Sequence, residues 1–501
     1  MSKGTVQFVG AGPGDPRLVT VRGAELLSRA THVFYDADVH PDLVARAPEG
    51  AERVAVARSR GGEHPERMAE LALGGARGVR LFAGDPLLFR WGDEEVARVT
   101  ARGVAIEIVA GVTSVTAASA YGGLALVRSN DASPSVAFAA VRDAAELHDW
   151  TKLSLATDTI ALITDSALVD EITATLTYYG RSPTSPAALL RDVSLPTQKV
   201  VTGTLVEMRR RTAEMGKGEV MLLVGEPLAF RAAIRWFDTR PLFGKRVLSL
   251  RAREQADVAS SLVRERGGEP VCVPAIEIHP PDDPAALRAA ARGLDRWDWV
   301  VFTSANGVRA FWEALGEAGL DARALGGKGL GAIGPGTARA IAEHGVRADV
   351  VAKEFRGEGL AEELARAMKP GSRVLVPRAT EAREALPEAL RAAGHAVDVV
   401  FAYRTRAPEG AAREALRAAV SGADVVLLTS ASTIKNLADA IGPDAAAVLA
   451  GRTVASIGPI TTDAAKALGV RVDVTAATYT LEGLVEAIEA FFARVGPGPV
   501  S

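Results

Sequence analysis

Short apolar runs alternate with helical patterns along the chain, and many of these runs end in glycine, aspartate or threonine. In the first half such runs occupy residues 6–10, 31–35, 79–82 and 105–109, and a similar succession continues from about 136 to 225. An apolar run that leads through a short polar turn into a helix is typical of a βα unit. The pattern therefore predicts an α/β fold with mainly parallel sheets, whose functional loops gather where the strands end.

The second half contains one pattern twice. Each copy has an apolar run closing on Thr-Ser-Ala, then Ile-Gly-Pro followed by a threonine, then Glu-Gly-Leu. The copies use residues 298–307, 333–337 and 358–360, and residues 424–432, 457–461 and 482–484. Three blocks in one order at nearly one spacing indicate a duplicated domain, not the short period of a solenoid. We therefore expect two similar α/β lobes that hold a ligand between them.

Size and composition are those expected of an ordinary soluble enzyme with several domains. The 501 residues suggest about three domains, and 58 basic against 61 acidic side chains leave a net charge of −3, which argues against a nucleic-acid partner. Apolar runs stop well short of the roughly 18 residues of a membrane span, and no secretory signal is recognisable. The single cysteine, Cys272, and seven scattered histidines indicate no metal site. We expect a cytoplasmic enzyme.

The two halves meet in a segment that favours neither helix nor strand. Residues 236–245 contain proline and glycine, the preceding helical pattern stops there, and a new apolar run begins at Arg246. We expect a first domain over residues 1–227, with subdomains of about 1–112 and 113–227, then a linker over 228–244, a second domain over 245–492 and a tail over 493–501.

Glycine-rich turns follow several strands of the first half. Alone, the spacing of Gly10, Gly12 and Gly14 differs from the dinucleotide-binding fingerprint and fits a structural turn. Taken together, five ordered motifs resemble the tetrapyrrole methylase family, specifically uroporphyrinogen-III C-methyltransferases, over about residues 4–227. The motifs are Gly10-Ala-Gly-Pro-Gly-Asp15, Tyr35-Asp36, Gly84-Asp85-Pro86, Gly111-Val-Thr-Ser114 and Val201-Thr-Gly-Thr-Leu205.

This resemblance implies a two-subdomain methylase fold that binds S-adenosylmethionine in a folded shape, usually in a homodimer. The implied reaction is methylation of uroporphyrinogen III at C2 and C7, which gives precorrin-2. Asp36 lies at the position of the family's acid/base aspartate, and Arg58 lies approximately at that of its lysine. The residues implied to contact the methyl donor are Pro13, Ala83, Gly84, Asp85, Leu88, Thr113, Ser114 and Thr164.

Several positions depart from the methylase pattern. Ala83 replaces a glycine and would bring a methyl group towards the donor, while Thr164 replaces a methionine and would remove an apolar wall. Further departures lie in residues 89–95, 110 and 127–131. These changes leave a second hypothesis open, in which the methylase-like half binds a ligand or partner without transferring a methyl group.

Turns of the second half place Ser, Thr or Asn where helices begin. Such residues commonly cap helix N-termini, so simple capping explains any one of them. If the helix starts converge on one cleft, their free N–H groups would bind carboxylates. The candidate residues of these turns, which include a glycine in each Ile-Gly-Pro motif, are Thr303, Ser304, Asn306, Gly334, Thr337, Thr429, Ser430, Ser432, Gly458 and Thr461.

The second half resembles the uroporphyrinogen-III synthase family over about residues 241–492. The matching stretches are residues 246–251, 273–277, 302–307, 333–337, 374–378 and 403–405. The resemblance implies two lobes joined by a two-stranded hinge, one over 245–278 with 406–492 and the other over 281–402. It implies that hydroxymethylbilane, a linear tetrapyrrole rich in carboxylates, is cyclised with inversion of ring D. The turn residues above, with Arg251 and Arg378, are then candidates for substrate contacts, unless the two arginines are solvated surface charges.

Tyr403 lies at the position of the synthase family's cleft tyrosine. Its hydroxyl would donate a hydrogen bond to the departing hydroxyl of hydroxymethylbilane, although an aromatic that only packs at the hinge would look the same in sequence. The leading hypothesis is a bifunctional enzyme, in which the synthase product uroporphyrinogen III is the methyltransferase substrate. A third hypothesis is a two-lobed tetrapyrrole-binding protein without catalysis.

Overall fold

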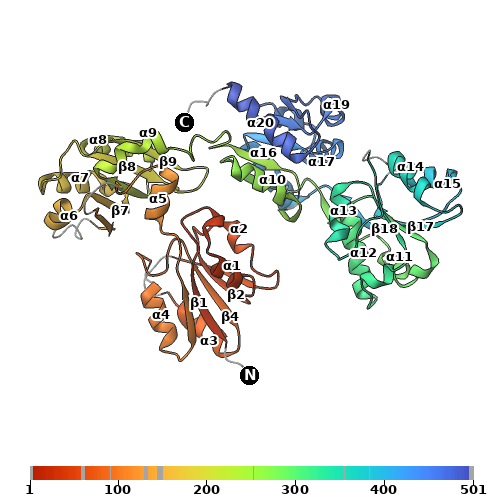
Figure 1. Cartoon of the computed structure of the whole chain (residues 1–501), viewed down its shortest axis with the longest axis horizontal. Helices are drawn as coiled ribbons and strands as arrows, with labels where there is room; N and C mark the ends of the chain where they lie inside the picture. Colours follow the sequence, from red (N-terminus) through yellow and green to blue (C-terminus); the bar gives the residue numbers. More distant parts are fainter. Residues whose placement is uncertain are drawn as a thin grey trace. The chain divides into compact units, whose positions relative to one another are not determined.

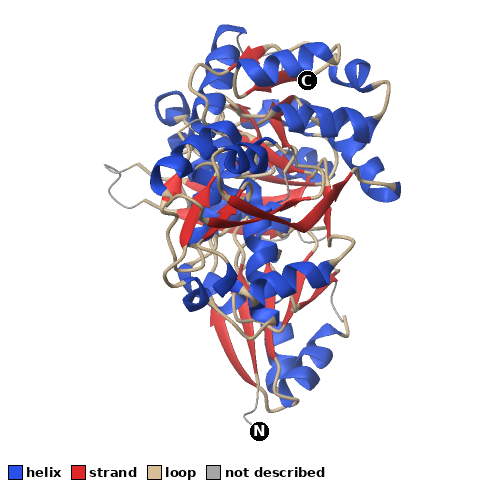
Figure 2. Ribbon diagram, turned by 90° about the vertical axis from the view of Figure 1, so that its right-hand side faces the viewer, coloured by secondary structure: helices blue, strands red, loops and turns tan. Residues whose placement is uncertain are grey.

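A computed structural model of the chain describes residues 4–57, 62–90, 92–128, 134–143, 150–251, 253–353, 357–382 and 384–495. Helices and strands alternate along these residues, and the described strands form four sheets (Figure 1). Figure 2 shows helices packed beside the strands throughout. The chain divides into two compact units, which are Met1–Val247 with Val258–Val271 and Val485–Ser501, and Leu248–Asp257 with Cys272–Leu484. The fold is α/β, as the sequence predicts.

The first sheet is wholly parallel, which confirms the expectation for the start of the chain. Its strands are β1 (Thr5–Gly10), β2 (His32–Asp36), β3 (Glu52–Val56), β4 (Arg77–Phe82) and β5 (Ala105–Val109), in the order β3-β2-β4-β1-β5. Its helices are α1 (Val21–Leu27), α2 (Pro41–Val44), α3 (His64–Leu73) and α4 (Gly92–Thr100). Leu27 and Leu43 of α1 and α2 pack in one buried cluster, and Met68 and Val99 of α3 and α4 pack in another. Both faces are thus covered, which explains why the central strands are largely apolar.

The second sheet is mixed, so the expectation that the parallel pattern continues to residue 225 is wrong. Its strands are β6 (Val136–Val141), β7 (Thr159–Asp165), β8 (Pro186–Arg191), β9 (Lys199–Thr204) and β10 (Glu219–Val224), in the order β6-β7-β10-β8-β9. β6 and β7 are parallel, whereas β10 pairs antiparallel with β7 and β8, and β8 pairs antiparallel with β9. The connection between β8 and β9 is too short for the crossover that a parallel pair needs. The helices here are α5 (Ser114–Gly122), α6 (Trp150–Ala156), α7 (Val169–Tyr178) and α8 (Leu205–Arg211).

The segment expected to be a linker is folded against the second sheet's part of the chain. It includes α9 (Arg231–Ile234) and then runs along the end of α5. The Trp236 indole donates to the Ala120 carbonyl at 2.7 Å, and the rings of Tyr121 and Phe237 meet edge to face at 4.8 Å. Aromatic packing of this kind fixes the segment by contacts that its proline and glycine content does not reveal.

The third and fourth sheets build the second half. The third has the order β12-β11-β19-β20-β21, with β11 (Arg246–Ser249), β12 (Glu269–Cys272), β19 (Val425–Leu428), β20 (Thr453–Ser456) and β21 (Val474–Thr475). The fourth has the order β13-β18-β17-β14-β15-β16, with β13 (Glu277–His279), β14 (Trp299–Phe302), β15 (Gly329–Ala332), β16 (Val350–Val351), β17 (Arg373–Ala379) and β18 (Ala396–Arg406). β13 and the end of β18 form an antiparallel pair within this sheet.

The predicted duplication is present in the structure. The path β14–α12–β15–α13–β16–α14 has the same order as β19–α17–β20–α19–β21–α20, apart from the inserted α18, and each set of three strands is parallel and adjacent. The helices of the second half are α10 (Arg253–Glu265), α11 (Pro284–Arg292), α12 (Ala305–Glu317), α13 (Pro335–Ala342), α14 (Gly357–Ala367), α15 (Ala385–Ala392), α16 (Gly410–Gly422), α17 (Ala431–Ile441), α18 (Ala445–Leu449), α19 (Pro459–Ala467) and α20 (Leu481–Val495). Among the helices of the described residues, none has the length and apolar character needed to cross a bilayer.

Candidate functional sites

Three glycine turns of the first sheet meet at the ends of β1, β4 and β5. The Gly84 amide donates to the Gly12 carbonyl at 2.9 Å. A Cβ added at Gly111 would lie 2.1 Å from the Gly84 carbonyl oxygen and 2.7 Å from Gly10 Cα. Because β4, β1 and β5 are neighbours in the sheet, their carboxyl ends come together at one edge. The sequence motifs that were expected to contact a methyl donor are therefore adjacent in space.

Asp85 ties these turns together. Its carboxylate accepts hydrogen bonds from the Leu87 and Gly111 amides, both at 2.9 Å. Next to it, Thr113 caps α5 by accepting from the Thr116 amide at 3.2 Å. Among the predicted donor contacts, Pro13 and Leu88 lie on the turns after β1 and β4, and Ser114 is the first residue of α5. The arrangement offers backbone groups and a helix N-terminus to a bound ligand.

Ala83 is a core residue of the first sheet. Its side chain is 3% exposed and belongs to a buried cluster with Val9, Ala11 and Leu81. The methyl group of Ala83 therefore packs in the core beneath the turn, and its contact with a methyl donor stays a prediction. The backbone amide of Ala83 donates a hydrogen bond to Asp36 Oδ2 at 3.1 Å.

Asp36 belongs to a buried network of charges. Arg80 Nη2 donates to Asp36 Oδ1 at 2.6 Å, and Arg80 also donates to both oxygens of Glu95, at 2.9 and 3.1 Å. His64 Nε2 lies 3.1 Å from Glu95 Oε1. The side chains of Asp36 and Arg80 are 2% and 3% exposed, and the guanidinium lies 4.1 Å from the centre of the Phe82 ring.

The charges of this network stabilise one another. Burial alone raises the pKa of the Glu95 carboxyl, but the contacts with His64 and Arg80 together outweigh burial and bring that pKa below its ordinary value. Burial lowers the pKa of Arg80, whereas its bonds and charge interactions with Glu95 and Asp36 raise it above the ordinary value. A buried ion network seldom stabilises a fold more than apolar packing would, so its value here lies in where it holds Asp36.

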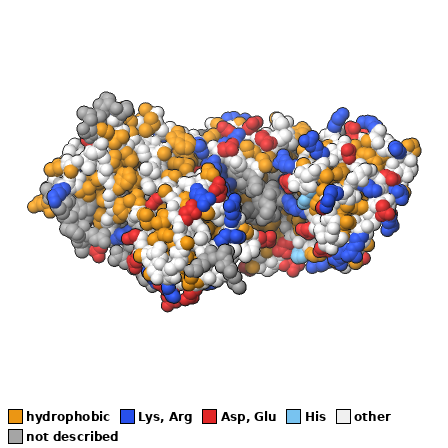
Figure 3. All heavy atoms as spheres, turned by 60° about the horizontal axis from the view of Figure 1, so that its bottom comes forward, with side chains coloured by type: hydrophobic (Ala, Val, Ile, Leu, Met, Phe, Trp, Pro, Cys, Tyr) orange, Lys and Arg blue, Asp and Glu red, His pale blue; other side chains and the backbone are white. Residues whose placement is uncertain are grey.

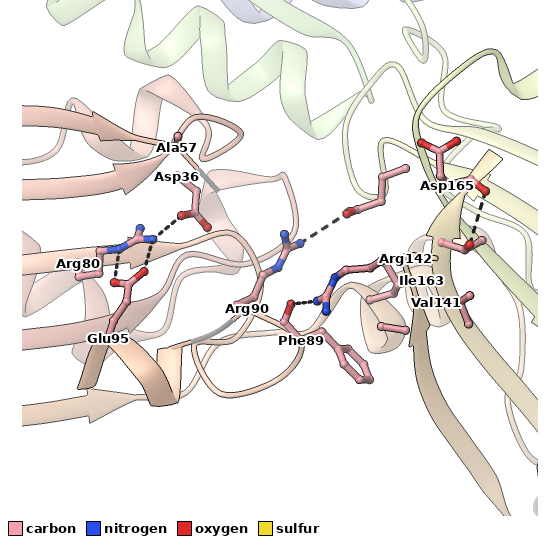
Figure 4. Close-up of a pocket in the computed structure, with 13 residues that line it drawn as sticks. Asp36, Ala57, Arg80, Phe89, Arg90, Glu95, Val141, Arg142, Ile163 and Asp165 are labelled. Carbon is pink, nitrogen blue, oxygen red and sulfur yellow. Dashed lines mark hydrogen bonds and ion pairs between the residues drawn. The ribbon is translucent and has the colours of Figure 1, made fainter. Parts of the chain in front are cut away.

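Asp36 and Arg80 line a cavity of about 300 Å³ between the first and second sheets (Figure 4). The other residues that line it are Ala57, Phe89, Arg90, Glu95, Ala140, Val141, Arg142, Ile163, Thr164, Asp165 and Glu219. Thr164, a predicted donor contact, is 3% exposed and forms part of the wall. Arg58 lies outside the described residues.

Sequence reasoning missed most of the cavity. Arg80, Glu95, Arg90 and Arg142 were not candidates, although Arg80 gave a signal. A charged residue within the apolar run of β4, immediately before a glycine turn, is unusual for a strand covered on both faces. Asp165 and Glu219, the acidic residues across the cavity, gave no such signal in the sequence. Nothing in their local sequence shows which strands of the second sheet face the first sheet.

In the second half, Tyr403 meets a helix cap. Its hydroxyl and that of Ser304 share a hydrogen bond at 2.9 Å, and Ser304 Oγ accepts from the Gly307 amide at 3.0 Å. Tyr403 is 7% exposed and belongs to the core of its lobe. Burial raises the pKa of Tyr403, and the hydrogen bond from Ser304 lowers it only in part, so its hydroxyl stays protonated at neutral pH. Thr303 and Asn306 flank Ser304 and are partly exposed.

The repeated turns are adjacent within each lobe. The Ile333 amide donates to the Phe302 carbonyl at 3.1 Å, and in the other copy Ile457 donates to Leu428 at 3.0 Å. Thus Thr303 and Ser304 stand beside Gly334, and Thr429 and Ser430 beside Gly458. Ser430 caps α17 and Ser432 lies exposed in its first turn, whereas Gly334 and Gly458 begin α13 and α19. Thr337 and Thr461 lie buried inside those two helices.

The two candidate arginines differ in environment. Arg251 is exposed, and its Nε donates to Thr429 Oγ1 at 3.3 Å. Arg378 is 3% exposed, and its guanidinium already binds the Glu384 carboxylate. Arg251 is therefore the better placed of the two to meet a carboxylate ligand. Among the described residues, no group of three or more His, Cys, Asp or Glu side chains could hold a metal ion.

Two families of known proteins match the chain. Residues 5–209 match the Tetrapyrrole (Corrin/Porphyrin) Methylases, and residues 257–486 match Uroporphyrinogen-III synthase HemD. The porphyrin biosynthesis protein HemD of Ruminiclostridium josui is 30% identical over 500 residues, covering 97% of this chain and 98% of that protein. The siroheme synthase of Sodalis glossinidius (strain morsitans) is 34% identical over 256 residues, which are 49% of this chain and 54% of that protein, so the chain spans about half of this relative.

Solved structures resemble each half. The uroporphyrin-III C-methyl transferase from Thermus thermophilus complexed with S-adenyl homocysteine is 31% identical, with a TM-score of 0.39, covering 45% of this chain and 99% of that one. A mutant uroporphyrinogen III synthase from Thermus thermophilus is 21% identical, with a TM-score of 0.37, covering 50% of this chain and 99% of that one.

The fold and the matches define a tetrapyrrole biosynthesis enzyme with a methyltransferase-family and a synthase-family half. The chain belongs to the family of porphyrin biosynthesis proteins, with a tetrapyrrole methylase domain followed by a uroporphyrinogen-III synthase domain.

Proposed function

We propose that the chain catalyses two consecutive reactions. Its second half cyclises hydroxymethylbilane to uroporphyrinogen III with inversion of ring D, and its first half methylates that product at C2 and C7 to give precorrin-2. The observation that carries the proposal is the position of Asp36, which is held by Arg80 at the wall of a cavity and bound to the amide of the donor-loop residue Ala83.

S-adenosylmethionine is the proposed methyl donor of the first half, and the residues fit such a group. Glycine at positions 10 and 111 lets the turns pack directly against one another, and at Gly84 an added Cβ would meet nothing closer than Arg90 Nε at 3.9 Å, so this turn leaves room for a ligand beside its backbone. The donor's sulfonium is a cation, and the nearby cavity holds the carboxylates of Asp36, Glu95, Asp165 and Glu219 against three arginines. When bound, the donor supplies an electrophilic methyl group.

In methyl transfer, the protein positions the two reactants and receives a proton. A pyrrole carbon is already electron-rich, so aligning it with the methyl group provides most of the rate. As the C–CH₃ bond forms and the S–CH₃ bond breaks, positive charge moves onto the ring, which then loses a proton. The anionic, oriented Asp36 stabilises that charge and accepts the proton.

In the second half the proposed work is also positioning. Helix starts at Ser304, Gly334, Ser430 and Gly458 offer N–H groups to the carboxylates of the linear tetrapyrrole, and Arg251 adds a cation. Tyr403 donates a hydrogen bond to the departing hydroxyl. The protein must hold a flexible chain so that inverted closure is faster than direct closure.

We propose the domain limits 1–227 and 245–492 and an assembly of two chains through the methylase half. Several large apolar side chains of that half are exposed, including Phe138 at 40%, Leu155 at 63% and Tyr178 at 83%. Figure 3 shows hydrophobic side chains gathered on its left, where Figure 1 draws α6 to α8. An exposed apolar patch of this kind is commonly covered by a partner.

A coupled assay tests both reactions. Purified protein receives hydroxymethylbilane with or without S-adenosylmethionine, and products are resolved by absorbance and by chromatography after oxidation. Uroporphyrin III without donor and precorrin-2 with donor support the proposal. Uroporphyrin III alone in both cases would indicate a synthase with a non-catalytic methylase half. The threonine at position 164 favours this alternative, because it replaces an apolar methionine of the methylase family's donor site. Absence of any conversion would contradict the whole assignment.

A further inference from the structure

The methylase-half cavity is also lined by two arginines that the proposed chemistry does not use. Arg90 lies on the loop between β4 and α4, and Arg142 directly follows β6 of the second sheet. In Figure 4 the two side chains lie between the sheets, one from each side of the cavity. A ligand in the cavity would therefore meet a cation from either sheet.

Each of these two guanidinium groups makes a contact that a carboxylate of a bound ligand can replace. Arg142 Nη2 donates to the carbonyl of Phe89 at 2.7 Å. Arg90 Nη2 lies 3.9 Å from Glu219 Oε1, and the side chains of Arg90 and Glu219 are 12% and 54% exposed. A guanidinium binds a carboxylate more strongly than a neutral carbonyl, and a loose ion pair at an exposed side chain contributes little.

The backbone beside Arg90 is strained. Phe89 has a φ of 63°, a left-handed conformation that is uncommon for a bulky residue. Its carbonyl in this conformation is the group that Arg142 binds. Strain of this kind persists where surrounding contacts enforce it, and it is concentrated at binding and catalytic sites.

We propose that Arg90 and Arg142 bind carboxylate side chains of the tetrapyrrole substrate and thereby orient a pyrrole ring towards Asp36. The inference rests on the proposed methyltransferase function and adds the residues that recognise its substrate. Arg80 cannot take this part, since its guanidinium is 3% exposed and held by Asp36 and Glu95. A cavity of about 300 Å³ accommodates part of a tetrapyrrole, so contacts from both sheets decide which ring enters.

Steady-state methylation by the full-length protein tests these roles. The variants are Arg90→Met and Arg142→Met, which keep the aliphatic stem, and Arg142→Lys, which keeps the charge. Each methionine variant is expected to raise the KM for uroporphyrinogen III by about tenfold or more, with the KM for S-adenosylmethionine unchanged. Arg142→Lys should recover part of the loss. An unchanged KM for uroporphyrinogen III in both methionine variants would overturn the proposal.

A matched control is available in the same unit. Arg209 pairs with Asp170 on the surface, where both side chains are about half exposed. Arg209→Met removes the same charge away from the cavity and should leave the KM for uroporphyrinogen III unchanged. An increase equal to that of Arg142→Met would assign the effect to net charge and contradict a specific contact.

A binding measurement separates this proposal from the proposed reaction. Uroporphyrin III, the oxidised and fluorescent form of the substrate, is titrated with wild type and with the Arg90→Met/Arg142→Met double variant. The synthase half contributes equally to both titrations. Loss of one binding site, or a tenfold weaker one, in the double variant supports the proposal even if the wild type transfers no methyl group. Identical site number and affinity would overturn it even if methyl transfer is observed.

Discussion

The hydroxyl groups of Ser304 and Tyr403 lie 2.9 Å apart, although 99 positions separate the two residues in the chain. Ser304 also accepts the hydrogen bond that caps α12. The N-terminus of that helix therefore sets the position of the tyrosine hydroxyl at the carboxyl end of β14. The hydrogen bond thus connects the repeated Thr-Ser turn with the tyrosine that matches the synthase family's cleft tyrosine. In the sequence these two features were separate candidates.

We predict that Tyr403→Phe slows formation of uroporphyrinogen III by about a hundredfold, because the departing hydroxyl loses its hydrogen-bond donor. The fraction of uninverted product should rise, since spontaneous closure is unaffected. Initial rates and isomer ratios measure both effects. Tyr178→Phe, at a tyrosine that is 83% exposed, is the control and should behave as wild type. A Tyr403→Phe enzyme with normal kinetics would leave the tyrosine as a packing residue.

The same tyrosine makes a prediction about pH. Its pKa is raised above the ordinary value of 10.0, chiefly by burial, so the hydroxyl remains a donor throughout the range below that value. The ratio of wild-type to Tyr403→Phe rates should therefore stay constant from pH 7 to about pH 9.5. A ratio that collapses towards one within that range would mean that Tyr403 ionises there and is not held as the structure has it.

We predict that Asp36→Asn lowers methyl transfer by about a hundredfold or more while donor affinity changes little. Asparagine keeps the shape of the side chain but removes its charge, and its single carbonyl oxygen can accept from Arg80 or from the Ala83 amide but not from both, as the carboxylate does. Turnover measures the first effect and calorimetry with S-adenosylmethionine the second. A fully active variant would remove Asp36 from the proton transfer.

Arg80→Met should destabilise the first unit strongly. It leaves the carboxylates of Asp36 and Glu95 buried without their shared cation, and breaking such a pair typically costs about 3–5 kcal/mol. The double variant with Asp36→Asn should recover part of the loss, because one uncompensated charge is removed. Thermal unfolding of the two variants tests this, and equal melting temperatures for Arg80→Met and wild type would contradict the network's role.

Gly111→Ala should disrupt donor binding. The added Cβ would lie 2.1 Å from the Gly84 carbonyl oxygen, so at least one of the two loops must move. We expect S-adenosylmethionine to bind at least about tenfold more weakly, a loss of about 1.4 kcal/mol. Gly78→Ala is the control, because its Cβ would meet nothing closer than 3.7 Å in the same sheet. Calorimetry on the two variants compares them, and equal affinities would count against the glycine turns as the donor site.

Local signals account for much of what the sequence predicted. The βα units, the parallel first sheet and the duplicated turns follow from hydrophobic periodicity and from Gly, Pro, Ser and Thr at turns, which act within a few residues. The mixed second sheet was missed because strand direction depends on which distant strand pairs with β10. The apolar runs of β7, β8 and β10 read alike whichever way their neighbours run.

The sequence by itself determined the two α/β halves, their internal duplication and the glycine turns of the first sheet, since each depends on residues close together in the chain. Tertiary structure decided which of these residues form a site. It placed Arg80 between Asp36 and Glu95, turned Ala83 into the core and set Arg90 opposite Arg142. Such contacts depend on the packing of segments that lie far apart in the sequence. Burying a charge costs free energy unless an opposite charge or a hydrogen-bond partner from another segment lies beside it.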